Sequence, residues 1–591
     1  MNKEELSNIH TQVSEFISKN KEKYDTIIDL QNILYNLTED SYPAAIELIN
    51  DNKNLFFNNH SNSIFFFCLI IKSSQFNFKH FEVNLDILLN FSPELKKCHT
   101  TDFELIGISS DFTNSLNYLF DKNFFSIESI ISYSFCDAFV FINFFPEIKK
   151  EDPEYAKKHL YNFFSPNRVQ NLSNYYVKDP YIRKKYLIEF LRMVQINPEE
   201  HIKNRNLNYH PSSLHKLIRE DDIDSFQSYL SQNEVSVNHR IKNSYYERAR
   251  TIDDSMSLIQ VSAIYGSIKI FKFLWLSQDI IIDENLLCYA YCGYNFDIIH
   301  LCESKCSYDK VYLQPIALHQ DNLLDYFIEN FSDEIKEDEK FKAKMKDFEN
   351  DENNLYQTHL NYASIEMAFY SLNYNVILNC LEKIVYIARN IQNVESNDGD
   401  NQISHIACID FDLFHFIYCQ RKPNIDKCKC GSHNKLLYNS IKLCKNDVVI
   451  FIFNDMKKID YIFILLSSCL KYNHDIANYI LDLQLEEKKR NEGPIFSEFY
   501  RNIYKDFLHE ALRIYDEDII VKMIKLYDFF DQGYASIFIQ HAFELLSSKM
   551  IVSLLKKLAT FVRKNDMILM MDILRGNDPK YISIFQQHRI I

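Results

Sequence analysis

The chain has 591 residues, with 65 lysines and arginines, 81 acidic side chains and a formal net charge of −16. Only 8 glycines and 12 prolines occur, which argues against an all-β sandwich or barrel and against an enzyme built on glycine-rich nucleotide loops. The acidic excess, without a concentrated basic stripe, excludes a typical nucleic-acid binder. This composition favours an all-α fold whose helices are joined by tight turns that contain Asn and Asp.

Residues 1–210 show helical patterns without a clear repeat, and we interpret them as an N-terminal helical region or cap. The segment Met1–Ser7 is polar and acidic, so we expect no secretory signal. The apolar runs Ile64–Ile71 and Phe135–Phe145 are too short to span a bilayer and predict buried helices. The 14 cysteines should then be reduced thiols, and we expect a cytoplasmic location, with the nucleus also open.

Residues 211–330 contain a recurring phrase, and its best copy runs over Ser257–Trp275. In that copy the small residue Ala263 precedes the turn glycine Gly266 by three positions, and an apolar helix face follows. The small residue recurs at a step of 27 residues, at Ala263, Ala290 and Ala317. An earlier copy covers Leu214–Leu230. Self-similarity at this period predicts a repeat architecture.

Each copy predicts two short antiparallel helices. The small residue lets the first helix lie close to its neighbour, and a Gly or Asn after it takes the left-handed conformation that ends this helix. One such pair cannot bury its apolar face alone, so successive pairs must stack into a curved solenoid of helical hairpins with degenerate repeats. The alternative is an irregular bundle of hairpins.

The remainder of the chain is less regular. Charged residues fill 331–354, which we interpret as a linker. Residues 355–591 carry degenerate copies of the repeat, for which the irregular bundle remains an equal alternative. These copies centre on Ala368, Ala407, Ser468, Ala511 and Ala542.

The segment 211–330 resembles the ankyrin-repeat family, whose repeat contains Thr-Pro-Leu-His, an alanine pair and Gly-His. Ser257–Gln260 replaces the opening tetrad, Ser262-Ala263 the alanine pair and Gly266-Ser267 the Gly-His. More closely, Leu214–Gln227 followed by Ser257–Trp275 is similar to the expanded ankyrin-repeat proteins of trichomonad protists, which carry a short repeat domain of unknown function. No intact Thr-Pro-Leu-His occurs, which leaves the repeat number open. The resemblance implies protein binding through loop tips and the inner helix face, and it supplies no catalytic residues.

The sharpest candidate for chemistry is a loop that contains Cys428, Cys430 and His433 and is followed by Cys444. Thiolate and imidazole ligands suit zinc, so a zinc-stabilised regulatory module around Cys428, Cys430 and His433 is one hypothesis. Against it, the spacing is Cys-x-Cys and no second close pair completes the set. Cys444 also lies in an apolar helix pattern, where free cysteine is an ordinary core residue. We predict no metal and no cofactor.

Other reactive residues have structural interpretations. The pairs Cys288/Cys292 and Cys302/Cys306 fall on repeat helices and predict buried thiols. His405 and His415 flank Cys408, but His405 falls at a turn-facing position of the repeat and is interpreted as structural. The triplet Glu220-Asp221-Asp222 lies between two expected helices and predicts helix caps.

No catalytic motif of the nucleophile-elbow, phosphate-loop or His-Glu-x-x-His type occurs. We therefore predict a non-enzymatic scaffold or adaptor that binds another protein, neither nucleic acid nor the membrane interior. The alternatives are the zinc-stabilised module and an enzyme with a cryptic site in residues 1–210.

Overall fold

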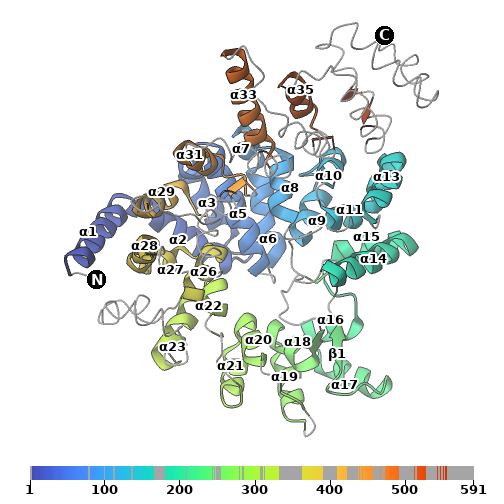
Figure 1. Ribbon diagram of the computed structural model, residues 1–591. Coiled ribbons are helices and arrows are strands. Elements are labelled where there is room, and N and C mark those ends of the chain that lie inside the picture. Colours follow the sequence, from blue (N-terminus) through green and yellow to red (C-terminus); the bar gives the residue numbers. More distant parts are fainter. Residues whose placement is uncertain are drawn as a thin grey trace. The chain divides into compact units, whose positions relative to one another are not determined.

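Figure 1 shows the computed structural model, a predominantly helical chain, in agreement with the predicted all-α class. The structure describes residues 3–76, 80–98, 100–110, 113–134, 137–164, 180–207, 209–242, 244, 246–247, 255–277, 280–282, 285–306, 311, 313–331, 362–390, 409–421, 437, 440–441, 443–456, 466, 473–490, 511–512, 516–526, 542, 546, 550–551 and 553–554. Among these, one two-stranded sheet departs from the helical pattern.

The chain forms two compact units, each assembled from separated segments. Unit 1 comprises Met1–Thr100, Asn114–Asp121 and Ile202–Leu436, and unit 2 comprises Thr101–Thr113, Lys122–His201 and Leu437–Ile591. The N-terminal helices thus share a unit with the segment that resembles ankyrin repeats. The domain bounds expected from the sequence remain predictions.

Unit 1 begins with seven helices, and apolar burial explains their packing. They are α1 (Lys3–Lys19), α2 (Lys21–Tyr35), α3 (Tyr42–Asp51), α4 (Lys53–Phe57), α5 (His60–Phe76), α6 (Phe81–Asn90) and α7 (Ser92–Lys97). Helix α5 packs against α2, α4 and α6. Every side chain from Ile64 to Ile71 is at most 5% exposed, which confirms the predicted buried helix and explains why this run is apolar on all sides.

The repeat segment of unit 1 consists of consecutive helical hairpins. They are α16 (Ser213–Arg219) with α17 (Ile223–Gln232), α18 (Leu258–Tyr265) with α19 (Ile268–Trp275), α20 (Leu286–Gly293) with α21 (Phe296–Glu303), α22 (Leu313–Ala317) with α23 (Asp321–Phe331), and α26 (Tyr362–Ser371) with α27 (Tyr374–Asn379). The first helices contact one another in series, α16 to α18, α20, α22 and α26. The second helices α17, α19 and α21 do the same.

Local sequence explains the best hairpin. Ser257 and Gln260 form a capping box that starts α18, and Gly266 ends the helix in the left-handed conformation with φ 67°. Ala263 is fully buried, as predicted for the small residue. The neighbouring Gly293 allows the closest helix approach, because a Cβ there would lie 1.9 Å from the carbonyl oxygen of Ala263.

The left-handed turn recurs between later helices, but its residue type differs from the prediction. Such residues are Asp221, Gly266, Tyr294, His319, Leu372 and Cys444. The expectation of Gly or Asn is correct at Gly266 and wrong at the others. At α20 the glycine lies one position earlier, at Gly293, where its missing side chain serves helix contact, and the left-handed conformation falls on Tyr294.

A short hairpin joins the first two repeats. Strand β1 (Arg240–Lys242) pairs antiparallel with β2 (Ser255–Ser257), and Ile241 lies opposite Met256 in the register. Both of these side chains are buried, whereas Arg240 and Lys242 are exposed. This alternation is typical of strands that cover a core on one face.

Unit 1 also contains α9 (Thr113–Asp121) from Asn114 onward, α28 (Leu381–Asn390) and α29 (Phe411–Arg421), while α15 (Pro198–Leu207) crosses the boundary at Ile202. The helices of unit 2 are α8 (Asp102–Ser110), α10 (Ile127–Ser134), α11 (Ala138–Asn143), α12 (Phe145–Glu151), α13 (Pro153–Phe164), α14 (Pro180–Ile196), α31 (Asn446–Met456), α33 (His474–Arg490) and α35 (Glu517–Leu526). No helix among the described residues has the length and apolarity needed to cross a membrane.

Candidate binding surfaces

In two of the turns, the residue that follows the left-handed residue links neighbouring hairpins by hydrogen bonds. The Asn295 side chain accepts a hydrogen bond from the backbone N–H of Ile298, which caps α21, and donates another to the carbonyl oxygen of Gly266 at 3.1 Å. Asn373 likewise accepts from the Val376 N–H and donates to the Ile316 carbonyl at 3.0 Å. One amide therefore both starts a helix and fixes the register to the preceding hairpin.

Helix α2 lies along two of these turns and along the start of α29. At the first, the Tyr35 ring stacks on His319 with centroids 3.8 Å apart. At the second, the Gln31 amide donates to the Leu372 carbonyl oxygen and accepts from the Tyr374 N–H. Because Gln31 is only 2% exposed, both of these buried backbone groups depend on it for satisfaction.

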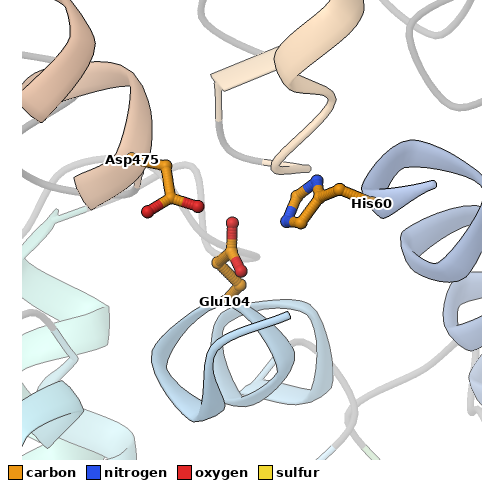
Figure 2. A group of neighbouring side chains, drawn as sticks. All are labelled: His60, Glu104 and Asp475. Carbon is orange, nitrogen blue, oxygen red and sulfur yellow. The ribbon is translucent and has the colours of Figure 1, made fainter. Parts of the chain in front are cut away.

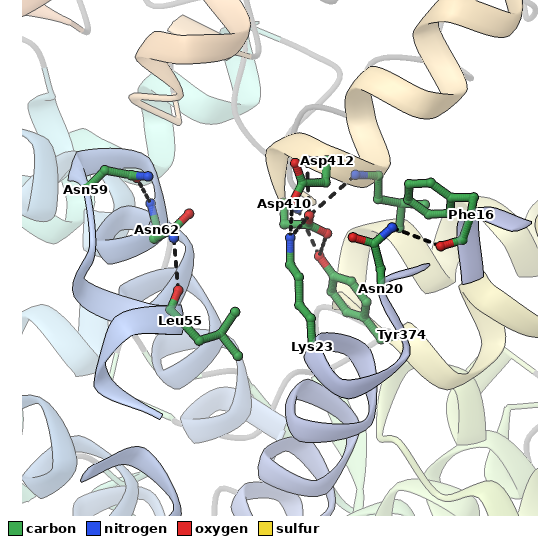
Figure 3. A network of polar contacts seen from close by, with 10 residues as sticks. Phe16, Asn20, Lys23, Leu55, Asn59, Asn62, Tyr374, Asp410 and Asp412 are labelled. Atoms are coloured by element: carbon green, nitrogen blue, oxygen red, sulfur yellow. Dashed lines mark hydrogen bonds and ion pairs between the residues drawn. The ribbon is translucent and has the colours of Figure 1, made fainter. Parts of the chain in front are cut away.

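The start of α29 carries a charged network (Figure 3). The ammonium group of Lys23 lies 2.6 Å from a carboxylate oxygen of Asp410 and 2.6 Å from one of Asp412. The Tyr374 hydroxyl donates to Asp410 at 2.9 Å. Burial alone would lower the pKa of Lys23, but its pairing with Asp410 and Asp412 outweighs burial and raises the pKa. The network fixes the N-terminal part of α2 on the start of α29.

The opposite ends of the helices carry the loops between hairpins. We use the name finger loops for residues 233–242 and for 276–277 with 280–282. They are joined by a hydrogen bond from the Ile281 N–H to the Asn238 side chain at 2.9 Å. Leu276 is 80% and Ile281 70% exposed, so two large aliphatic side chains of the second finger loop face solvent. We interpret this exposed apolar surface as a candidate interaction site.

Glu247, whose side chain is buried, lies in the connection between β1 and β2 and anchors it. Its carboxylate accepts from the Tyr265 hydroxyl at 2.6 Å and from the His210 N–H at 3.2 Å, and it lies 3.2 Å from His215 Nε2. The Asn114 side chain donates to its carbonyl oxygen at 3.1 Å. The hairpin is therefore held by polar contacts that reach α16, α18 and α9.

The His215 ring is completely buried beside this carboxylate. Burial lowers the pKa of His215 to about 4, against the opposing attraction of Glu247. The ring is therefore neutral near pH 7. Burial, followed by the charge of Glu247, raises the pKa of Tyr265 well above its usual value, so its hydroxyl remains a donor. This is an anchoring arrangement, and we assign it no catalytic role.

The predicted zinc loop is outside the described residues: Cys428, Cys430 and His433 belong to it. Cys444 is described, is 1% exposed and lies in the left-handed turn that precedes α31. The zinc hypothesis therefore remains an untested prediction. His405 and Cys408 also lie outside the described residues, while His415 is exposed and its Nε2 lies 3.5 Å from Cys419 Sγ.

The four cysteines have the predicted core environment in part, and Cys306 lies beyond the end of α21 rather than on a helix as predicted. Cys288 and Cys302 are buried, and Cys292 and Cys306 are half-buried. Burial raises the pKa of Cys292 to about 12, and a hydrogen bond with Cys306, together with burial, raises that of Cys302. These groups are protonated thiols at neutral pH, which are poor nucleophiles.

Within the acidic triplet, Asp222 caps the next helix as predicted. The Asp222 carboxylate caps α17 by accepting from the Ser225 N–H at 3.1 Å. Asp221 accepts from the Ile270 N–H at 3.0 Å and so links the first hairpin to the second. None of these contacts supports an acid–base catalytic role for the triplet.

Sequence reasoning did not single out the cluster in Figure 2, where carboxylate oxygens of Glu104 and Asp475 in unit 2 lie within 4.8 Å of each other. Glu104 is 2% exposed and accepts from the Thr101 N–H at 2.8 Å and the Thr101 hydroxyl at 3.0 Å, which caps α8. His60, also drawn, belongs to unit 1. We assign no metal site to this group.

The α2 contacts were also missed by sequence reasoning. A signal for one of them exists: Gln31 is an amide residue among the apolar and aromatic residues that form the buried face of α2. Comparison with known proteins found no match among family models, curated proteins or solved structures. The site descriptions therefore rest on the geometry of this chain.

Proposed function

We propose that the chain is a non-enzymatic scaffold or adaptor, an ankyrin-like solenoid that binds another protein through its loop tips and inner helix face. The observation that carries this proposal is the pair of exposed aliphatic residues on the finger loops, Leu276 and Ile281. Their exposure to water is unfavourable, and a partner that buries this apolar surface would gain free energy of binding.

The series of hairpins supports the same proposal. First helices contact first helices, and second helices contact second helices, from α16 to α21. Such an arrangement presents successive loops side by side, which is how repeat proteins form extended binding surfaces. The ankyrin resemblance, the absence of a catalytic motif in the sequence and the acidic net charge favour a protein partner over nucleic acid, and we place this function in the cytoplasm or nucleus.

A capture experiment with the full chain tests the proposal. Proteins retained from native lysate by the wild type are compared with those retained by the double variant Leu276→Asp/Ile281→Asp. The control is Ile196→Asp, because Ile196 is 83% exposed at the end of α14 and far from these loops in sequence. We expect partners that are lost in the double variant and kept in the control. Equal retention by all three proteins would overturn the role of the finger loops.

A second measurement addresses the non-enzymatic part. Purified protein should show no turnover that a single substitution abolishes. Robust turnover of any substrate, removed by one point variant, would overturn the scaffold proposal.

A further inference from the structure

Equivalent cap positions occur at the starts of α29 and α21. In α29, Asp410 accepts from the N–H groups of Asp412 and Leu413 and so occupies the cap position, and Asp412 follows two residues later. In α21 the corresponding residues are Asn295, which caps the helix, and Asp297. The pair Asp410/Asp412 binds Lys23 of α2. The Asp297 carboxylate of α21 therefore occupies the same position relative to the helix cap as Asp412 in α29, which pairs with Lys23 of α2.

The contacts of α2 have the spacing of the stacked hairpins. Tyr35 follows Lys23 by twelve residues, which is about 18 Å along an α-helix. Helices that pack side by side are about 8–10 Å apart, so this length covers two steps of the stack. Tyr35 accordingly meets the turn at His319, Gln31 the turn at Leu372 and Lys23 the start of α29.

The next turn in the series has aromatic side chains that are exposed to solvent. Helix α2 ends at Tyr35, on the His319 turn, and the preceding turn is that of α20 and α21. We call Tyr294–Asp297 the open turn. Tyr294 is 42% and Phe296 44% exposed, and their ring centroids are 5.6 Å apart. Tyr294 occupies the left-handed position that His319 occupies in the next hairpin, where the Tyr35 ring covers it.

The charge at the open turn also matches that at the start of α29. The Asp297 side chain is 68% exposed and lies 3.4 Å from the ammonium group of Lys272, whose side chain is 53% exposed. Exposed ion pairs of this kind contribute little, so the carboxylate can exchange this partner for another cation at small cost. At the start of α29 the cation is Lys23, which lies on α2.

We propose that the open turn binds an amphipathic helix of another protein, which places an aromatic side chain against Tyr294 and Phe296 and a lysine against Asp297. This second surface lies at the other end of the hairpins from the finger loops, and it rests on the stacked-repeat interpretation rather than on those loops. The bound helix continues the path of α2 along the turns.

The probe for the test is a fluorescently labelled peptide of residues 20–36, because it contains α2 with both required side-chain types. Its binding to the full chain is followed by fluorescence anisotropy. The test variant is Tyr294→Asn/Phe296→Ser, in which Asn tolerates the left-handed conformation at position 294. The control variant is Leu483→Ser, which removes a comparably exposed residue, 41%, from α33.

We expect saturable binding to the wild type and to Leu483→Ser, and a Kd at least about tenfold higher for the double variant. Asp297→Lys should weaken binding similarly, and a peptide with Lys23→Glu should restore it. Absence of saturable binding, or equal Kd values for the double variant and the wild type, would overturn the proposal. The second result would mean that the peptide only exchanges with resident α2.

Sedimentation of the full chain tests whether a second copy of the chain, rather than another protein, occupies the open turn. Self-association that is abolished by Tyr294→Asn/Phe296→Ser would mean that a second copy covers the open turn, which would overturn the partner-helix proposal. A monomer at the concentrations of the peptide experiment is the expected result. Failure of the open turn would leave the finger-loop capture result unchanged, so the two proposals fail separately.

Discussion

Gln31 of α2 donates a hydrogen bond to the carbonyl oxygen of Leu372, a residue held in the left-handed conformation more than three hundred positions later in the chain. The same amide accepts from the Tyr374 N–H at 3.3 Å. Helix α2 thus completes the hydrogen bonding of a repeat turn. The same contacts fix the position of α2.

The variant Gln31→Leu tests this relationship. Leucine fills similar space but leaves the Leu372 carbonyl and the Tyr374 N–H unsatisfied, so we expect a loss of about 1–3 kcal/mol in the free energy of unfolding in urea. The matched control is Asn32→Leu, an exposed position one residue further along α2. Equal stability of Gln31→Leu and the wild type would contradict the described role of the amide.

Gly293 provides a test of helix spacing. Gly293→Ala places a Cβ against the backbone of α18, 1.9 Å from the Ala263 carbonyl oxygen. Backbone cannot yield as a side chain does, so we expect destabilisation of about 3 kcal/mol or more in thermal or urea unfolding. In Gly107→Ala the nearest atom is a ring carbon of Tyr133 at 3.3 Å, and a much smaller effect is expected. Similar effects of both variants would argue against the close approach.

His215 predicts a pH dependence of stability. Its folded pKa of about 4 lies below the value of about 6.5 in an unfolded chain. The unfolded state therefore binds more protons between these values, so the contribution of His215 is complete above pH 6.5 and is lost progressively as the pH falls toward 4. This amounts to about 3 kcal/mol.

The measurement is urea unfolding of the wild type and of His215→Gln from pH 7 to pH 4. The variant should have a shallower decline, whereas His300→Gln, at a 57% exposed side chain, should retain the wild-type slope. Parallel curves for His215→Gln and the wild type would exclude a depressed pKa at His215.

Metal analysis tests the predicted absence of zinc. Purified protein should contain less than about a tenth of an equivalent of zinc. Close to one equivalent, lost in Cys428→Ser/Cys430→Ser, would establish the zinc-stabilised module instead. Cys444→Ser separates the predicted fourth ligand from a core thiol, since a buried core residue would change stability without changing metal content.

Local features of the fold could be predicted where the chain specifies them within a few residues. Ser257, Ala263 and Gly266 fall at a cap, a buried contact and a left-handed turn, as their types indicate. The left-handed residue after α20 was predicted incorrectly, because a glycine can permit either a left-handed backbone or a close helix contact. Gly293 serves the helix contact, and Tyr294 takes the left-handed conformation. The three-residue strands β1 and β2 are too short for a period-two pattern to be recognised.

The contacts of α2 with the later turns and with α29 could not be predicted from local patterns. Lys23 and Asp410 are almost four hundred residues apart, and periodicity carries no information about which distant turn a helix will meet. The exposure of Leu276 and Ile281 was equally inaccessible, because an aliphatic residue near a helix end is ordinarily read as core.

Site-specific photocrosslinking at Ile281 in the full chain tests the central claim most directly. A photoreactive residue at position 281 should form a discrete protein adduct in native lysate, and one at Ile196, which is at least as exposed, should not. A specific adduct that disappears when Leu276→Asp is added is the result we predict. The same adduct pattern from both positions, or none from position 281, would contradict a binding surface on the finger loops.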